Sequence, residues 1–353
     1  MNYFVIGYYA LLIGASCVTA HYNMRGAFMA LFSLTLASFV MGIIGGEPAL
    51  WSVTVGAGVI ALCAGTAFAF REFLSIILPH EGAKAMRSAP LTASFGLFVI
   101  GTYAITGIFA PIIAPFGEAE VIAQAFEPAN EDMLLGADQL GRDLFSRLVY
   151  GARNTVGLAL TATFAAFIMG AFAGLLAATV GGWFDQFMGR FADVIMSIPS
   201  LIFALLMLSI FGTNLFVLVV IVAVIYSPRV FRLTRAVAGN IVVMDYIEAA
   251  KLRGEGLWYL IRREILPNST APLIAEFGLE FCFVFLLVAG LSFLGLGIQP
   301  PTADWGSMVR ENATLISFGE ITPLIPAGAI ALLTVSVNFV VDWMLYRSSG
   351  LKE

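Results

Sequence analysis

Uncharged apolar runs of about 20 residues recur along the chain and alternate with short polar segments. A run of that length, wound as a helix, crosses the roughly 30 Å hydrocarbon core of a membrane. Within lipid, a helix satisfies all of its own backbone polar groups, which an open strand does not. The pattern therefore predicts nine membrane-spanning helices, at residues 2–20, 26–46, 50–70, 92–115, 154–180, 191–211, 214–228, 271–298 and 321–345.

The composition agrees with this pattern. Hydrophobic residues make up 60% of the chain and charged residues 12%, and the mean hydropathy is +0.93. A soluble domain is typically about half apolar and a quarter charged. The expected fold class is an all-α integral membrane protein, a polytopic helical bundle. The first run lacks a preceding basic residue, so we expect a retained helix rather than a cleaved signal peptide.

A charged segment, residues 244–268, separates two of the apolar runs. Asp245 followed by Glu248 is typical of a capping box and predicts a short helix from Tyr246 to near Gly254. Apolar residues then recur at helical spacing, and Pro267 is expected to end that second helix. Two short helices joined by a glycine turn would form a knob between two spans.

Basic residues are distributed unevenly between the two sides that these spans define. If residues 229–270 are cytoplasmic, 14 of the 18 basic residues face the cytoplasm and four remain outside: Arg142, Arg147, Arg153 and Arg310. Cytoplasmic segments of membrane proteins carry such an excess. We therefore expect an external N-terminus and a cytoplasmic C-terminus.

Several motifs carry a resemblance to a known family. Glu248-Ala249-Ala250, Gly254 and Leu266-Pro267 match the EAA loop of ABC importer permeases. The stretches LGADQLGRD, YGARNTVGLAL and LSFLGLGIQPPTADWGSM, beginning at residues 135, 150 and 291, narrow the match. The chain resembles the second permease subunit of the dipeptide/oligopeptide/nickel importer family over residues 89–346.

The resemblance implies a domain plan. Residues 76–353 would form a type I ABC importer permease core of about six helices, with an external loop at 116–153 and a cytoplasmic EAA coupling loop at 229–270. Residues 1–75 would be an N-terminal extension of about three helices. The family usually has a single span before the external loop, so this extension is a departure from it.

The resemblance also implies partners and a location. The chain would pair with a homologous permease as a heterodimer in the bacterial cytoplasmic (inner) membrane. It would bind two ABC ATPase subunits and receive substrate from an external solute-binding protein. Residues of the EAA loop would make the ATPase contact: Glu248, Ala249, Ala250, Gly254, Leu266 and Pro267. Dipeptides, longer peptides, nickel chelates, sugars and opines are all conceivable substrates.

Catalytic chemistry is not expected in this chain. An ATP-binding P-loop needs Gly-Lys followed by Ser or Thr, and glycine precedes none of the three lysines. ATP and magnesium would be used by the partner ATPases, and this chain would bind no cofactor. Neither metal-ligand spacing nor a nucleophile–base set is present among the cysteines and histidines. The partners expected are proteins and the lipid bilayer, with no nucleic acid.

The external loop contains a motif that we interpret as structural. Asp138 is placed to cap a short helix over residues 139–150, with Gly141, Arg142 and Asp143 beside it. That helix would lie along the outer membrane surface and shape the vestibule. Repeated glycines are expected to allow close helix packing in the core, at residues 151, 157, 170, 174, 181 and 182.

Two acidic residues lie inside a predicted span. Glu276 and Glu280 are four residues apart and share one helix face. An intramembrane carboxylate is expensive and often functional. One interpretation is that Glu280, with Glu276, lines the translocation path and binds a substrate amine or an ion. The other is that Glu276 lies at the cytoplasmic interface and Glu280 pairs with the second permease subunit.

Two other classes of function stay open at this point. An ion-coupled secondary transporter would place a charge such as Glu280 near the midplane, and a membrane scaffold would use the helices without transport. The EAA knob separates them, because only an ATP-coupled permease depends on it. Pro199 and Pro228 are each expected to kink or end a helix.

Overall fold

The computed structural model describes residues 14, 48–318, 320 and 322–348 of the 353. Apart from residue 14, the spans predicted at 2–20 and 26–46 lie outside the described residues. The chain divides into two compact units, residues 1–98 and 99–353, which are considered separately. The domain boundary expected at residue 75 stays a prediction.

The first unit contains α3 (Pro48–Ile77), α4 (His80–Ser88) and the beginning of α5 (Leu91–Ile108). α3 contains the predicted run 50–70 and continues beyond it. α4 is short and amphipathic, and it buries Ala85 and Met86 while its charged residues stay at the surface. The segment 71–90, which lies between two predicted spans, is therefore largely helical.

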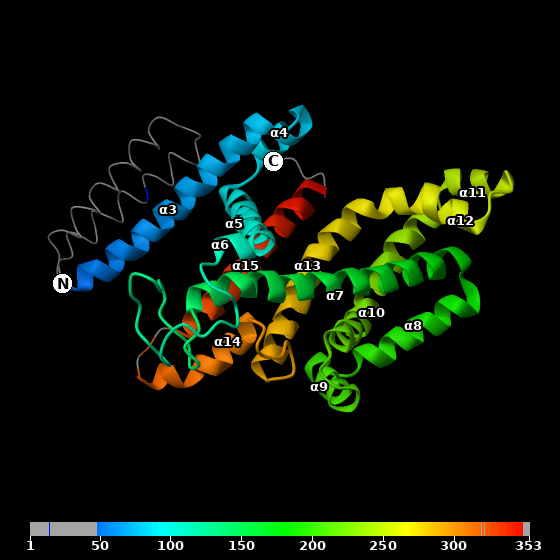
Figure 1. Cartoon of the computed structure of the whole chain (residues 1–353). Coiled ribbons are helices and arrows are strands. Elements are labelled where there is room, and N and C mark those ends of the chain that lie inside the picture. The colour runs from blue at the N-terminus through cyan, green and yellow to red at the C-terminus, as the bar shows by residue number, and fades with distance from the viewer. Residues whose placement is uncertain (1–13, 15–47, 319, 321, 349–353) are drawn as a thin grey trace. The chain divides into compact units, whose positions relative to one another are not determined.

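The second unit is a helical bundle (Figure 1). After α5 its elements are α6 (Ala110–Ile113), α7 (Leu144–Val180), α8 (Gly182–Met196), α9 (Ser200–Phe211), α10 (Leu215–Val242), α11 (Asp245–Leu252), α12 (Leu257–Tyr259), the π-helical turn η1 (Leu260–Ile265), α13 (Leu266–Phe293), α14 (Trp305–Asn312), the 3₁₀ turn η2 (Ala313–Phe318) and α15 (Leu324–Ser348).

Membrane-spanning candidates within the described residues are five helices: α5, α7, α10, the continuous α12–α13 rod and α15. The pair α8 and α9 would make a sixth if it counts as one span, and it bends by 88°. The all-helical polytopic class is confirmed. Among the described residues of the second unit the polypeptide forms two isolated β-bridges and no strand.

Hydropathy located these helices but misjudged several ends. α7 begins at Leu144, so the helix predicted along the membrane surface at 139–150 is wrong, and the irregular outer loop ends at residue 143. α10 runs on to Val242 and the next rod begins at Leu257, so most of the loop predicted at 229–270 is helix. Polar residues continue these helices beyond their apolar runs, which is why the runs alone understate their lengths.

The prolines act differently from one another. Pro199 separates α8 from α9 and so breaks the predicted span 191–211. Pro228 lies inside α10, where it removes the hydrogen bond to the carbonyl four residues earlier. The Ser227 hydroxyl donates to that carbonyl, of Val224, at 3.3 Å. A side-chain donor of this kind lets a membrane helix continue through proline.

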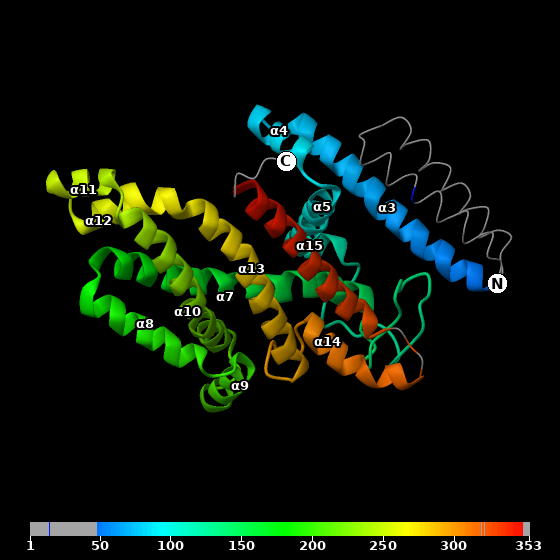
Figure 2. The same cartoon turned by 180° about the vertical axis from the view of Figure 1, so that it is seen from behind.

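The most extensive helix–helix packing in the second unit is between α7 and α10, which cross in both Figures 1 and 2. Gly170 and Gly174 permit this approach. A Cβ atom at Gly174 would lie 2.8 Å from the Phe231 carbonyl oxygen and 2.8 Å from the Thr234 Cβ. Gly151 serves the same purpose near the other end of α7, where the Trp305 indole lies against it. By contrast, Gly157 faces open space, and Gly181 and Gly182 form a turn with positive φ.

We expect Gly174→Ala to destabilise the purified protein by about 1–3 kcal/mol, because the backbone of α10 must move to admit the methyl group. Gly157→Ala on the same helix is the matched control, since nothing lies within 4 Å of its added Cβ. Thermal unfolding in detergent measures both. Equal melting temperatures for the two variants would contradict the packing described here.

Candidate functional site

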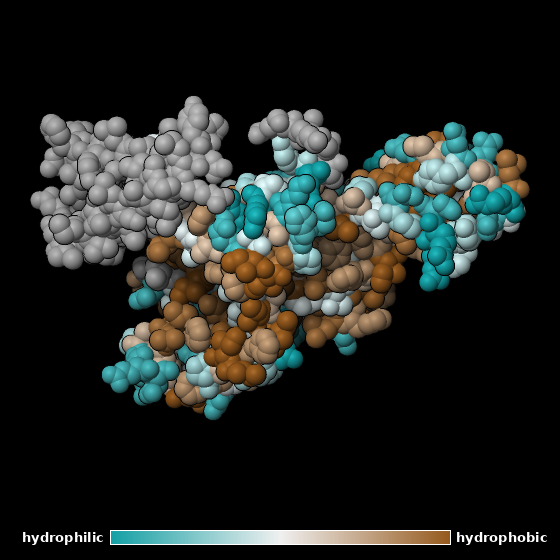
Figure 3. All heavy atoms as spheres, turned by 90° about the horizontal axis from the view of Figure 1, so that it is seen from above, coloured by the Kyte–Doolittle hydropathy of each residue, from teal (hydrophilic) through white to brown (hydrophobic). Residues whose placement is uncertain are grey.

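The end of the bundle that holds α11 and α12 presents polar side chains, with apolar ones among them, at its surface (Figure 3). Residues 243–265 form this feature, which we call the knob. Its interior is a small apolar cluster in which Ile247, Ala250 and Ile265 pack on residues of α7 and α10. Ile247, Ala250 and Ile265 are fully buried. The knob is thus fixed to the long helices as one packed unit.

Gly254 ends α11 in a Schellman motif. Its φ is +83°, its N–H donates to the Lys251 carbonyl at 2.9 Å, and the Glu255 N–H donates to the Ala250 carbonyl at 3.2 Å. This pairing satisfies carbonyls that the helix end leaves free, and the left-handed residue in it is usually glycine. The predicted glycine turn at Gly254 is present.

Two details of the predicted knob are wrong. α11 begins at Asp245 with Met244 before it, and no side chain caps it, so Asp245 and Glu248 do not form a capping box. Pro267 does not end the second helix, because the rod continues to Phe293. The π turn η1 ends at Ile265, two residues before Pro267. Its wider winding occurs where the proline ring would crowd the preceding helical turn.

The EAA residues divide between two faces of α11. Glu248 and Ala249 are exposed, whereas Ala250 is buried against the knob's own core. Leu266 and Pro267 are exposed at the beginning of α13. Large apolar side chains also lie open on the knob, and the most exposed are Leu252 at 84% and Val243 at 79%. A surface of this kind, with apolar groups next to a carboxylate, suits a protein partner.

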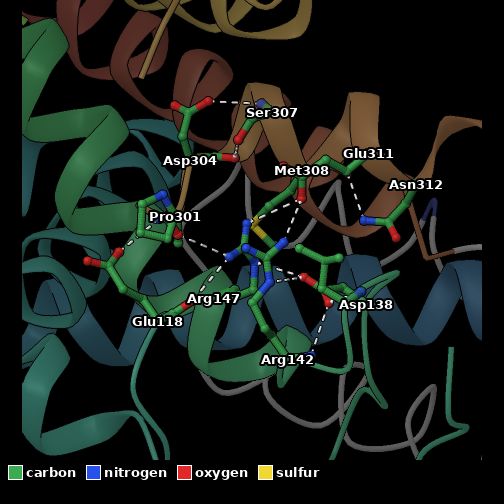
Figure 4. Close-up of polar contacts among 12 residues, drawn as sticks. Glu118, Asp138, Arg142, Arg147, Pro301, Asp304, Ser307, Met308, Glu311 and Asn312 are labelled. Carbon is green, nitrogen blue, oxygen red and sulfur yellow. Dashed lines mark hydrogen bonds and ion pairs between the residues drawn. The ribbon is translucent and has the colours of Figure 1, made fainter. Parts of the chain in front are cut away.

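The opposite end of the bundle contains a buried ion-pair cluster of Asp138, Arg142, Arg147 and Glu311 (Figure 4). Arg142 Nε donates to Asp138 Oδ2 at 2.7 Å, and its Nη2 lies 3.1 Å from Glu311 Oε2. Arg147 lies 3.3 Å from each of the same two carboxylates. All four side chains are at most 7% exposed. The cluster joins the outer loop to α7 and α14.

The motif residues of the outer loop shape this cluster. Asp138 accepts hydrogen bonds from the N–H groups of Leu140 and Arg142 at 2.8 and 3.0 Å, so it organises a turn and caps no helix. Asp143 is the residue that caps α7, and it accepts from the Ser146 N–H at 2.8 Å. Gly141 has a φ of +78° and leaves no room for a Cβ beside the Ala123 backbone.

The loop between α13 and α14 is fastened to α7 by a second set of polar contacts. Asp304 caps α14 by accepting from the Ser307 N–H at 2.9 Å, and the Thr155 hydroxyl donates to it at 2.8 Å. The Trp305 indole N–H donates to the Leu148 carbonyl at 2.9 Å. Burial raises the pKa of Asp304, and the hydrogen bonds from Ser307 and Thr155 oppose that rise.

Glu276 and Glu280 lie on one side of α13, as predicted. Glu280 is 2% exposed, and its Oε2 atom has no hydrogen-bond partner among the described residues. Glu276 is half-buried. Arg229 of α10 is the cation that attracts both carboxylates.

Sequence reasoning missed several of these residues. Arg147 and Glu311 pair across 164 positions of the chain, and Thr155 meets Asp304 across 149. One signal for Arg147 was available, because it is one of only four basic residues placed outside by the charge bias. Arg229 was assigned to a cytoplasmic loop, although it lies within a long apolar helix.

Fold and site together define a polytopic membrane protein with a packed knob at one end and, at the other, an outer loop fixed by buried ion pairs. Residues 169–349 match the family described as binding-protein-dependent transport system inner membrane component. The chain belongs to this family, the permease subunits of ATP-driven importers, which are non-catalytic multi-pass components of the bacterial inner membrane.

Individual relatives agree with the family match. The dipeptide transport system permease protein DppC of Alkalihalophilus pseudofirmus is 33% identical over 264 residues, which cover 74% of this chain and 86% of the relative. The di/tripeptide permease protein DppC of Pseudomonas aeruginosa is 34% identical over 254 residues, covering 70% and 84%. The probable D,D-dipeptide permease protein DdpC of Escherichia coli is 31% identical over 266 residues, covering 74% and 89%.

Proposed function

We propose that this chain forms half of the translocation path of a peptide importer and that its knob transmits ATP-driven closure from a pair of ABC ATPases. The main support for this proposal is the structure of the knob. It is rigidly packed on α7 and α10, and it presents Glu248, Ala249 and exposed apolar side chains. A displacement of such a knob must move the long helices to which it is packed.

The proposed assembly has a companion permease as heterodimer partner, two ATPase subunits at the knobs and a solute-binding protein outside. ATP and magnesium act in the ATPases. The knob then lies in the cytoplasm, and the ion-pair cluster faces outward. The outer-loop residues Asp138, Gly141, Arg142 and Asp143 keep the vestibule in shape. Peptides are the proposed substrates because the relatives named above are peptide permeases.

Glu280, with Glu276, is proposed to line the path. Glu280 is buried within this chain, and its unpaired oxygen leaves a carboxylate that a passing ammonium group would satisfy. The unpaired oxygen, rather than the burial, supports the path interpretation.

Reconstitution tests the proposed function. The chain is purified alone and as a complex with the permease, ATPase and binding-protein subunits of its source genome, and both preparations are placed in liposomes. We expect ATP hydrolysis and accumulation of dipeptides only in the assembled complex. Uptake by the chain without ATPases, driven by a proton gradient, would instead indicate a secondary transporter.

A further inference from the structure

A cationic side chain lies at an open cavity beside the break between α8 and α9. Arg229 lines a cavity of about 360 Å³ together with residues at the break between α8 and α9, among them Met196, Pro199 and Phe203. Arg229 is half-buried, and no carboxylate of the described residues lies within 4 Å of its guanidinium. An intramembrane arginine without an ion pair is costly, so its retention needs a reason.

Two aromatic rings hold the guanidinium in place. Its central carbon lies 5.2 Å from the ring centre of Tyr226 and 5.1 Å from that of Phe283. Tyr226 is itself fixed, because its hydroxyl donates to the Phe283 carbonyl at 3.0 Å. Aromatic faces attract a guanidinium without accepting in-plane hydrogen bonds from its N–H groups. The guanidinium group is therefore held in one orientation, and its N–H donors remain available.

Arg229 and Glu280 lie at matching depths. Arg229 is 14 residues from the first residue of α10, Leu215, which is about 21 Å along the helix at 1.5 Å per residue. Glu280 is 13 residues from the last residue of α13, Phe293, or about 20 Å. The two helices meet where the Tyr226 hydroxyl donates to the Phe283 carbonyl, one turn from Arg229 on α10 and one turn from Glu280 on α13. A positive and a negative group thus occupy one level of the bundle.

We propose that Arg229 binds the terminal carboxylate of a short zwitterionic peptide in transit, with the peptide's ammonium group attracted to Glu280. This inference rests on the proposed function and identifies the part of the path that recognises the substrate. A guanidinium matches a carboxylate with two parallel hydrogen bonds, which a neutral side chain does not reproduce. The cavity at the α8–α9 break provides room beside that guanidinium.

Uptake of an equimolar mixture of dipeptides with free termini and of the same dipeptides as C-terminal amides, followed by mass spectrometry of the liposome contents, tests the proposal in the full complex. We expect Arg229→Gln to lower this uptake at least tenfold and to abolish any preference for free acids over C-terminal amides. Glu280→Gln should also lower it. Arg232→Gln, one turn further along α10 with a side chain 60% exposed, is the matched control and should transport normally.

Each outcome decides a separate point. A wild-type complex that imports no dipeptide would overturn the proposed function. A wild-type complex that imports them, with Arg229→Gln importing as fast as Arg232→Gln, would overturn only the role of Arg229. If Arg229→Gln fails to assemble, Arg229→Lys tests the role of Arg229 instead. Lysine keeps the positive charge but lacks the paired N–H donors of the guanidinium. Wild-type uptake by Arg229→Lys would then overturn the proposal.

Discussion

Gly254→Ala is expected to lower ATP-driven uptake roughly five- to thirtyfold while the complex still assembles. The left-handed conformation of Gly254, with a φ of +83°, costs about 1–2 kcal/mol in any residue with a Cβ atom. No atom lies within 4 Å of the added methyl group, so the effect is confined to the turn. The knob would lose its fixed shape, and transport in liposomes measures the loss.

Gly256→Ala is the control for this variant. Gly256 lies two residues away, has a φ of −75° that alanine readily adopts, and also has no atom within 4 Å of an added Cβ. It should transport at the wild-type rate. Equal activity of the two variants would show that the shape of the turn is irrelevant to coupling.

Arg147→Met is expected to cost about 3–5 kcal/mol of stability, the usual penalty for removing one partner of a buried ion pair. Two carboxylates, of Asp138 and Glu311, would then share the single cation Arg142 in a site nearly closed to water. The variant should show a lower melting temperature and faster proteolysis of the outer loop. Arg153→Met, an exposed arginine on the same helix, should change neither measurement.

A second substitution distinguishes charge balance from packing. Arg147→Met combined with Glu311→Gln leaves Asp138 paired with Arg142 and no surplus buried charge. We therefore expect the double variant to be more stable than Arg147→Met alone, because the unpaired carboxylate has been removed. Further destabilisation by Glu311→Gln would contradict the description of the cluster as a balanced set of charges.

The positions of the helices could be predicted from the sequence, but their ends could not. Apolar runs report where lipid covers a helix, and α10 continues past its run as an amphipathic rod with Thr234 and Ala238 buried. Pro228 suggested a break, yet the hydroxyl of its neighbour Ser227 satisfies the carbonyl that the proline frees. Pro199, by contrast, lies at a true break and separates α8 from α9. Whether a proline breaks a helix therefore depends on the hydrogen bonds of its neighbours, which the proline alone does not show.

Local chemistry at the candidate site was also predictable, whereas distant pairing was not. The glycine turn at Gly254 follows from the residues beside it. Asp138 was predicted to cap a helix, whereas it organises a turn, and its partners Arg147 and Glu311 come from different elements. Arg229 was overlooked because a basic residue after an apolar run resembles the end of a span. Only the fold shows that it lies level with Glu280.

The central claim, that the knob is the ATPase contact, is tested most directly by photocrosslinking in membranes. A benzoylphenylalanine replaces Leu252, the most exposed apolar residue of the knob, and in a second preparation replaces Leu134 of the outer loop, which is 67% exposed. We predict that position 252 crosslinks to an ATPase subunit and that position 134 does not. A complex in which position 252 yields no ATPase crosslink, or position 134 yields one, would contradict the account.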